Sequence, residues 1–325
     1  MPANLPPQYY EAEKNLRTAK NATEKILVLE ELLGIMPKHK GTDHLRAELR
    51  TRIAKLTQQE DKKAGTHRAS MVIDKEGAAQ VAVVGLPNAG KSQLVGAITN
   101  ASPLVADYPF TTHSATPGMM EFENIKIQLI DTPPLVPQAI EFWLVHLLRA
   151  ADALLVLLDL NDAPLDQMEA VMAQLEKMRI AITKPRPDIA ELIIAQPKAL
   201  IVGNKLDLPN ARHNLESLQA KYGDQLPVVG ISAKDRTGLE DMKLKLFQVL
   251  DIIRVYTKTP GQKADFNDTI ILKKGSTLED GAAQVHKDFA ARLKYARIWG
   301  SGKHDGVMAK RDHVLQDGDV IELHL

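Results

Sequence analysis

The sequence predicts an α/β protein in which a mostly parallel sheet carries helices on both faces. Between residues 70 and 260, short apolar runs rich in β-branched side chains alternate with amphipathic segments, an order typical of a parallel sheet. Residues 8–60 instead repeat apolar side chains at helical spacing, and residues 261–325 combine short strand-like runs with one helical segment. We therefore expect an N-terminal helical hairpin at 1–69, the α/β domain at 70–260 and a small α+β domain at 261–325.

The N-terminal segment is predicted to form two helices joined by a break. Pro37–Gly41 interrupts the helical pattern, and Thr42 or Asp43 is a suitable N-cap for the second helix. Two interpretations stay open: the hairpin packs as a structural element, or it is a docking arm for a large partner. The second is favoured slightly by basic side chains, namely Lys38, Lys40, Arg46, Arg50, Arg52 and Lys55.

The middle segment divides into six strands and five helices. The predicted strands are Gln80–Gly85, Met119–Glu123, Lys126–Asp131, Ala153–Asp159, Ala199–Gly203 and Pro227–Ile231. The predicted helices are Lys91–Asn100, Val136–Ala150, Asp166–Arg179, Leu215–Tyr222 and Leu239–Val255. Open sheets of this kind bind ligands at the carboxyl edge of their strands, so we expect the functional residues there.

The last segment changes character. Thr269–Leu272 is predicted as a short strand and Leu278–Tyr295 as a helix, and Leu315–Leu323 reads as a turn followed by a strand. This pattern indicates a small, separate α+β domain.

Composition excludes several classes of site. The 325 residues are 44% hydrophobic and 25% charged, as in ordinary globular proteins, and the absence of cysteine excludes disulfides and Cys-ligated zinc or iron–sulfur centres. No apolar run approaches the roughly 18 residues of a membrane span, and the first residues lack a signal-peptide pattern, so we expect a cytoplasmic protein. The net charge is zero, and even the first 70 residues carry only 13 basic against 9 acidic side chains. Bulk charge therefore gives no argument for nucleic-acid binding.

Residues 85–92 read Gly-Leu-Pro-Asn-Ala-Gly-Lys-Ser and fill every fixed position of a phosphate-binding loop. Gly85 and Gly90 let the backbone turn so tightly that successive N–H groups point at phosphate oxygens. Lys91 can then reach the β- and γ-phosphates, and the Ser92 hydroxyl can ligate Mg²⁺. The loop follows a predicted strand and opens a predicted helix, which completes an anion site. We expect a nucleoside triphosphate bound with Mg²⁺.

Two further loops point to the base. Asn204-Lys-Leu-Asp207 follows a predicted strand, and a carboxylate at Asp207 can accept hydrogen bonds from N1–H and the 2-amino group of guanine, which adenine does not offer. Ser232-Ala-Lys234 ends the next strand and matches the companion loop whose backbone amide meets the guanine oxygen. In this order the two loops favour GTP over ATP.

The metal site is expected to involve Asp131, which ends a strand in Asp-Thr-Pro-Pro. A carboxylate there holds the water molecules of Mg²⁺. Asp107–Thr112 lies between the phosphate loop and Asp131, and one of its threonines should close over Mg²⁺ and the γ-phosphate. We favour Thr112 over Thr111. The expected metal residues are Ser92, Thr112 and Asp131.

With these motifs the chain resembles the Obg-related GTPases, and most of all the branch of developmentally regulated GTP-binding proteins that end in a TGS domain. The resemblance rests on Gly85–Ser92, Tyr108–Thr112, Asp131–Pro133, Asn204–Asp207, Ser232–Lys234, Val285–Asp288, Tyr295–Gly300 and Leu315–Val320. It implies a G domain, a C-terminal β-grasp TGS domain, and a cytoplasmic GTPase associated with ribosomes or their RNA, with no role for DNA or membranes. The span from Asp131 to Asn204 is too short for the extra subdomain that eukaryotic members carry.

We expect GTP or GDP to contact residues of all these motifs. They are Gly85, Pro87, Asn88, Ala89, Gly90, Lys91, Ser92, Gln93, Phe110, Thr111, Thr112, Asp131, Asn204, Lys205, Asp207, Ser232, Ala233 and Lys234.

Two positions depart from the usual GTPase pattern. Pro134 stands where a glycine N–H normally binds the γ-phosphate, and proline has no N–H. Leu135 stands where many GTPases place a glutamine that orients water. We therefore expect slow hydrolysis that depends on Lys91, Thr112 and Asn88.

Asn88 occupies the position at which potassium-dependent GTPases hold K⁺ against the phosphates, although asparagine also shapes such loops; a residue supplied in trans by the ribosome is the competing source of charge. Two alternatives stay open: a scaffold regulated by GTP occupancy with negligible hydrolysis, and a P-loop kinase or ATPase. The oligomeric state is not predicted.

Overall fold

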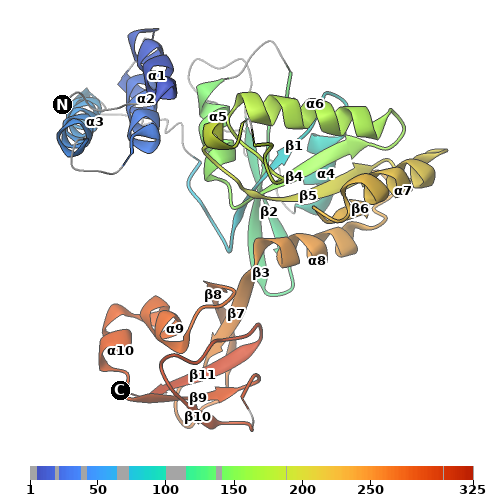
Figure 1. Cartoon of the computed structure of the whole chain (residues 1–325). Coiled ribbons are helices and arrows are strands. Elements are labelled where there is room, and N and C mark those ends of the chain that lie inside the picture. Colours follow the sequence, from blue (N-terminus) through green and yellow to red (C-terminus); the bar gives the residue numbers. More distant parts are fainter. Residues whose placement is uncertain are drawn as a thin grey trace.

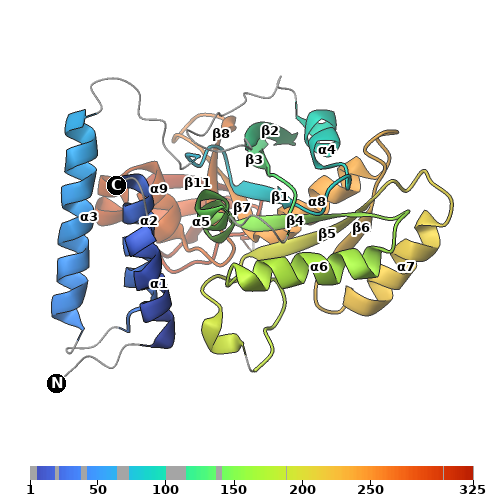
Figure 2. The ribbon, with the colours of Figure 1, turned by 90° about the horizontal axis from the view of Figure 1, so that it is seen from above.

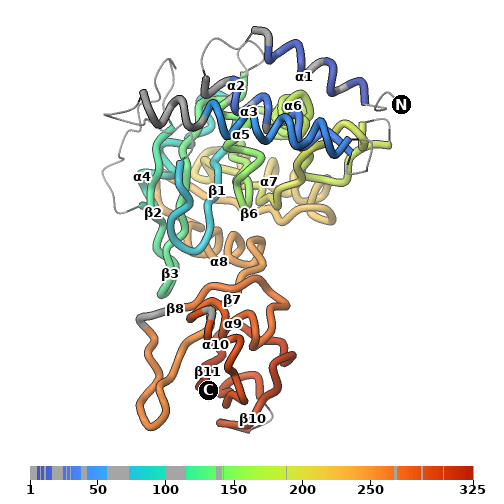
Figure 3. The backbone as a smooth tube through the Cα atoms, turned by 90° about the vertical axis from the view of Figure 1, so that its left-hand side faces the viewer, coloured from blue at the N-terminus to red at the C-terminus, as the bar shows by residue number. Residues whose placement is uncertain are grey.

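The computed structural model describes residues 6–18, 22–37, 42–63, 73–99, 115–136, 141–187, 189–302 and 304–324. Within these ranges the chain forms a helical bundle, a central domain built on a six-stranded sheet, and a C-terminal domain built on a five-stranded sheet (Figure 1). The bundle lies beside the central domain in Figure 1 and in front of it in Figure 3, and the C-terminal domain lies below the central domain in both views. No helix in the described ranges has the length and apolar character needed to cross a membrane.

The helical bundle contains three helices, α1 (Pro7–Thr18), α2 (Ala22–Ile35) and α3 (Asp43–Lys63). The expected two-helix hairpin is therefore wrong in one respect, since its first arm is divided into α1 and α2. All three helices contribute to one apolar core, formed by Tyr9, Ala12, Val28, Leu29, Leu32, Met36 and Leu49.

Two of the six basic side chains noted in this segment have partners within the bundle. The guanidinium of Arg46 donates to the carbonyls of Met36 at 2.8 Å and Leu33 at 3.3 Å, which satisfies acceptors at the end of α2. Arg52 lies 3.8 Å from Glu48 on the same helix. Lys38 and Lys40 lie outside the described residues. These contacts favour the interpretation of the bundle as a packing element.

The central sheet has the strand order β2-β3-β1-β4-β5-β6, in which β2 is antiparallel to β3 and the other pairs are parallel. The strands are β1 (Gln80–Val84), β2 (Thr116–Phe122), β3 (Ile125–Asp131), β4 (Ala153–Asp159), β5 (Lys198–Asn204) and β6 (Val228–Gly230). All six predicted strands are confirmed, and so is the fold class. Register places Val83 beside Asp131 and Asp159 beside Asn204. The polar side chains of Asp131, Asp159 and Asn204 therefore lie at the carboxyl edge of the sheet.

Helices cover both faces of the central sheet (Figure 2). They are α4 (Lys91–Ile98), α5 (Phe142–Ala150), α6 (Pro164–Lys177), α7 (Ala211–Tyr222) and α8 (Leu239–Leu250), with a short 3₁₀ turn at Ala190–Leu192. In β1, Ala82 and Val84 pack with α5, α6 and α7, whereas Val81 and Val83 pack with α4 and α8. The near-continuous apolar runs of these strands follow from this burial on both faces.

The C-terminal domain has the strand order β10-β9-β11-β7-β8, and α9 and α10 cover one face of its sheet (Figure 1). Its elements are β7 (Ile252–Thr257), β8 (Asp265–Lys273), α9 (Leu278–Val285), α10 (Lys287–Arg292), β9 (Tyr295–Trp299), β10 (Val307–Ala309) and β11 (Asp319–His324). The single helix predicted over Leu278–Tyr295 is therefore wrong, because two short helices end at Arg292 and Tyr295 begins a strand.

The predicted helix Leu239–Val255 is also wrong at its end. Helix α8 stops at Leu250 because Asp251 adopts a left-handed conformation with φ of 50°, a conformation that aspartate tolerates better than most residues. The following strand, β7, pairs with β8 and β11 in the second sheet. The expected domain boundary at residues 260–261 thus falls after a strand that belongs to the C-terminal domain.

Candidate nucleotide-binding site

The phosphate loop, residues 85–90, requires its two glycines for different reasons. A side chain at Gly85 would place its Cβ 2.4 Å from the carbonyl oxygen of Leu157 on β4. Gly90 has φ of 94°, and a Cβ there would lie 2.4 Å from the Asn204 amide nitrogen. The loop thus passes close to two neighbouring strands before α4 begins at Lys91, so its amides and the N-terminus of α4 face the same space.

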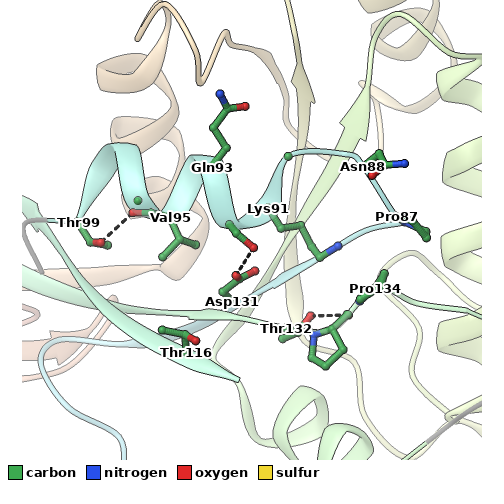
Figure 4. Close-up of a pocket in the computed structure, with 14 residues that line it drawn as sticks. Pro87, Asn88, Lys91, Gln93, Val95, Thr99, Thr116, Asp131, Thr132 and Pro134 are labelled. Carbon is green, nitrogen blue, oxygen red and sulfur yellow. Dashed lines mark hydrogen bonds between the residues drawn. The ribbon is translucent and has the colours of Figure 1, made fainter. Parts of the chain in front are cut away.

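That space is a cavity of about 720 Å³ at the carboxyl edge of the sheet (Figure 4). Its lining residues are Pro87, Asn88, Gly90, Lys91, Ser92, Gln93, Val95, Gly96, Thr99, Thr116, Asp131, Thr132, Pro133 and Pro134. The phosphate loop and the segment that begins at Asp131 were predicted from separate motifs, and the structure brings them together in one cavity.

Lys91 is the buried cation of this cavity. Its Nζ donates to the carbonyls of Gly85 at 3.3 Å and Leu86 at 3.2 Å. Burial lowers the pKa of Lys91, and the nearby Asp131 carboxylate counteracts part of that effect. A nearby anion strongly stabilises a buried ammonium group, so a phosphate group is a suitable ligand for Lys91.

Asp131 and Ser92 provide oxygen atoms suited to a hard cation. The Ser92 hydroxyl donates to Asp131 Oδ2 at 2.5 Å (Figure 4), and the other carboxylate oxygen, Oδ1, is buried with no hydrogen-bond partner among the described residues. Burial raises the pKa of Asp131, while the Ser92 hydrogen bond and the Lys91 charge lower it to a lesser extent. A buried carboxylate with an unused acceptor fits Mg²⁺ with its bound water.

Asn204 connects the phosphate loop with the Ser232–Lys234 loop, which was predicted to bind the base. Its side chain is buried; Nδ2 donates to the Ala89 carbonyl at 2.9 Å and Oδ1 accepts from the Ala233 N–H at 3.0 Å. The phosphate loop and the Ser232–Lys234 loop are thus joined through one side chain.

Asp207 is exposed beside that junction. Its Oδ1 accepts a hydrogen bond from the Ser232 hydroxyl at 2.7 Å, which lowers the pKa of Asp207 and keeps it ionised. The positive charges of Lys234 and Lys205 act in the same direction. An ionised, exposed carboxylate with a fixed orientation can accept the two donors of guanine.

Two other predicted contacts shape the loops themselves. Lys205 has φ of 67°, and its ammonium pairs with Asp159 at the end of β4. Asn88 is exposed with φ of 63°, a conformation in which asparagine is enriched. Gln93 lines the cavity, but its side chain points away from Asp131 (Figure 4).

The two unusual positions have different surroundings. Pro134 lines the cavity, whereas Leu135 is 1% exposed and belongs to the apolar core beneath it. The Leu135 N–H donates to the Gly85 carbonyl at 3.1 Å. Leu135 therefore holds the start of the phosphate loop through its backbone, while its side chain packs in the core.

Thr116 and Thr132 are cavity residues that the site prediction missed. Thr116 was missed because the predicted strand began three residues later, and its pairing opposite Asp131 depends on the hairpin register. The Thr132 hydroxyl donates to the Val83 carbonyl at 2.8 Å. Phe110, Thr111 and Thr112 lie outside the described residues.

Two family comparisons agree with these domains. Residues 80–194 match the family described as 50S ribosome-binding GTPase, and residues 253–325 match the TGS domain.

Curated relatives are similar over nearly the whole chain. GTP-binding protein 1 of Schizosaccharomyces pombe is 28% identical, with 92% of this chain and 98% of that protein covered. Human developmentally-regulated GTP-binding protein 2 is 26% identical with the same coverage. The alignments run over 357 and 358 positions, so both relatives contain segments without a counterpart among these 325 residues.

Among solved structures, the YchF GTPase of S. pombe shares the fold. Its TM-score is 0.54 at 14% identity, and the match covers 77% of this chain and 99% of that one.

Proposed function

We propose that the chain is an Obg-related GTPase with a TGS domain, and that it is a Mg²⁺-dependent switch that hydrolyses GTP slowly to GDP and phosphate. The observation that supports a guanine nucleotide as the ligand most directly is the position of Asp207, which is exposed and ionised next to the loop junction made by Asn204. In this proposal Lys91 binds the phosphates, and Ser92 and Asp131 hold Mg²⁺, which would neutralise charge on the phosphates.

The remaining predicted contacts form part of the same proposal. The base would be held by Asn204, Lys205, Asp207, Ser232, Ala233 and Lys234, and the phosphates by Gly85, Pro87, Asn88, Ala89, Gly90 and Gln93, with Phe110, Thr111 and Thr112 closing over them.

Base selection is tested by replacing Asp207 with asparagine. The amide would meet the 2-amino group of guanine with a donor, so we expect GTP affinity to fall at least about 100-fold. Xanthosine triphosphate carries an oxygen at that position, so its affinity should rise. The Ser232 hydroxyl can still donate to the new side chain, which keeps the loop in place. Tighter binding of ATP than GTP by the unaltered protein would instead establish the kinase or ATPase alternative.

Slow hydrolysis is supported by the two unusual positions. Pro134 has no N–H to give to a γ-phosphate, and Leu135 is packed in the core and has no polar group for water. Single-turnover hydrolysis should therefore be slow without a partner and rise when ribosomes are added. A rate near zero in both conditions would favour the scaffold that is regulated by GTP occupancy alone.

We propose K⁺ as a candidate activator, held by Asn88. Two roles for this side chain can be separated because its backbone is left-handed. Asn88→Gly keeps that conformation and removes only the amide. If the amide helps to bind K⁺, stimulation by K⁺ over Na⁺ disappears in this variant. If asparagine only shapes the loop, the variant behaves like the parent protein in both salts. Equal rates of the parent protein in K⁺ and Na⁺ would overturn the proposal.

The proposed partner is the ribosome or its RNA, in the cytoplasm. Its support is the family match and the resemblance to the developmentally regulated GTP-binding proteins. Co-sedimentation with ribosomal subunits, compared between Mg²⁺ with a non-hydrolysable GTP analogue and Mg²⁺ with GDP, tests it. Pelleting that is equally weak in both states would contradict a ribosome-linked switch.

A further inference from the structure

The β2–β3 hairpin reaches from the nucleotide cavity to the C-terminal domain. At one end Thr116 pairs with Asp131, and both line the cavity. Pairing continues without a register shift to Phe122 and Ile125, which flank the turn at the other end. Seven residues per strand at roughly 3.4 Å each give a ribbon about 20 Å long. Figures 1 and 3 show this ribbon pointing from the central sheet towards the C-terminal domain.

The turn of the hairpin is bonded to the C-terminal domain through Asn124. Its Nδ2 lies 2.7 Å from the Tyr256 hydroxyl on β7 and 2.9 Å from the Thr269 hydroxyl on β8. Both partners are strand residues of the second sheet, so the turn contacts the rigid part of that domain.

An ion-pair network strengthens the same contact. The Arg254 guanidinium pairs with Glu123 of the turn on one side and with Asp317 of the C-terminal domain at 2.7 Å on the other. The Arg254 side chain is 12% exposed and Asp317 is 35% exposed, whereas Glu123 is 59% exposed, so the pair with Asp317 is screened less by solvent than the pair with Glu123.

Packing joins α8 to the contact as well. The ring centroids of Phe122 and Phe247 are 5.2 Å apart, and the Arg254 guanidinium lies 5.0 Å from the Phe247 ring centroid. A displacement of the hairpin end therefore changes charged and polar contacts to β7 and an aromatic contact to α8 together.

We propose that the β2–β3 hairpin couples the bound nucleotide to the contact between the central and C-terminal domains. The contacts of Glu123 and Asn124 with the C-terminal domain would then differ in strength between the GTP and GDP states. The inference rests on the proposed function, because it needs a ligand that acts on Asp131. Mg²⁺ is present with either nucleotide, so the difference would come from the γ-phosphate. Its added charge beside the metal would change how strongly the Asp131 carboxylate is drawn away from Ser92, at one end of a continuous ribbon. The other end is fixed to a different domain, so the two sites share one structural element.

Hydrogen exchange of the full chain tests the coupling. Exchange in β7 and β8 is compared between Mg²⁺ with a non-hydrolysable GTP analogue and Mg²⁺ with GDP. We expect rates that differ by about fivefold or more in the parent protein, and a difference that is lost in the double variant Glu123→Ala, Asn124→Ala. Glu121→Ala is the matched control, because Glu121 is exposed on the same hairpin and, among the described residues, forms an ion pair only with Lys126 of that hairpin, at 4.0 Å. This control should keep the full difference.

The phosphate loop provides an internal reference in the same experiment. If residues 85–92 are not protected by either nucleotide, the proposed function fails. If they are protected but β7 and β8 exchange equally in both states, only the coupling is overturned, as it also is if the double variant keeps the difference. Coupling is reciprocal, so the double variant should also change the ratio of GTP to GDP affinity, and Glu121→Ala should not.

Discussion

Asn204 donates to the carbonyl of Ala89, which fixes the phosphate loop to the end of β5 with a 2.9 Å hydrogen bond. The same side chain accepts the Ala233 N–H, and both partner residues are buried. The distance between the phosphate and base subsites is therefore set by the protein alone. Preorganisation of this kind reduces the ordering cost of ligand binding.

Replacing Asn204 with alanine should weaken both stability and nucleotide binding. It leaves a buried carbonyl and a buried N–H without their partner, at a cost of about 2–4 kcal/mol in the free energy of unfolding. Urea unfolding and GDP titration measure the two effects. Asn161→Ala, an exposed asparagine in the loop after β4, should change neither. A variant with normal stability and normal affinity would show that the junction is dispensable.

Leu135→Gln should not create a faster GTPase. Leu135 is buried in the core below the phosphate loop, so a glutamine there buries an amide instead of presenting it to water. We expect the free energy of unfolding to fall by about 2–4 kcal/mol, with no gain in GTP turnover. Leu135→Met, which keeps the volume, should cost less than about 1.5 kcal/mol. Faster turnover at unchanged stability would mean that this side chain can reach the γ-phosphate.

The central domain and most of its site were predictable because the motif residues stand where strands end. Asp131 and Asn204 each follow an apolar run, and parallel strands bring such ends to one edge. What could not be predicted is that the Asn204 side chain joins two loops, because its two hydrogen-bond partners lie 115 and 29 residues away in the sequence. The buried position of Leu135 likewise depends on how the chain after β3 passes beneath the phosphate loop.

The C-terminal domain was harder to predict because its strands depend on distant partners. Tyr295–Trp299 forms β9 by pairing with β10 and β11, although its residues continued a helical spacing. The end of α8 was missed because an aspartate, Asp251, takes the left-handed position that glycine usually marks. Local patterns carry no signal for either feature.

Glu31 should hold the helical bundle against the central domain. Its carboxylate lies 3.9 Å from both Arg149 and Arg179, and all three side chains are less than a fifth exposed. Glu31→Ala would remove the carboxylate that these two mostly buried guanidinium groups share, so we expect a loss of about 1–3 kcal/mol and faster proteolytic release of the bundle. Glu48→Ala removes an exposed pair within α3 and should cost less than about 0.5 kcal/mol. Equal effects of the two changes would contradict this role.

Mg²⁺ binding should weaken on acidification because of Asp131. Burial raises its pKa above the ordinary value of 3.8, despite the opposing effects of Ser92 and Lys91. The ionised carboxylate therefore opposes folding at neutral pH, and this cost disappears as the pH falls through the raised pKa. Metal binding needs the ionised form, so Mg²⁺ affinity should begin to fall at a higher pH than for an exposed aspartate.

Titration of Mg²⁺ into the GDP complex between about pH 7.5 and about pH 5.5 measures this effect. Asp131→Asn is the control, because the phosphates of GDP titrate equally in both proteins and the amide does not titrate. The parent protein should lose more affinity over this range than the variant, because only its side chain at this position titrates. Parallel pH profiles would mean that Asp131 is already fully ionised throughout, and that its burial is relieved in the nucleotide complex.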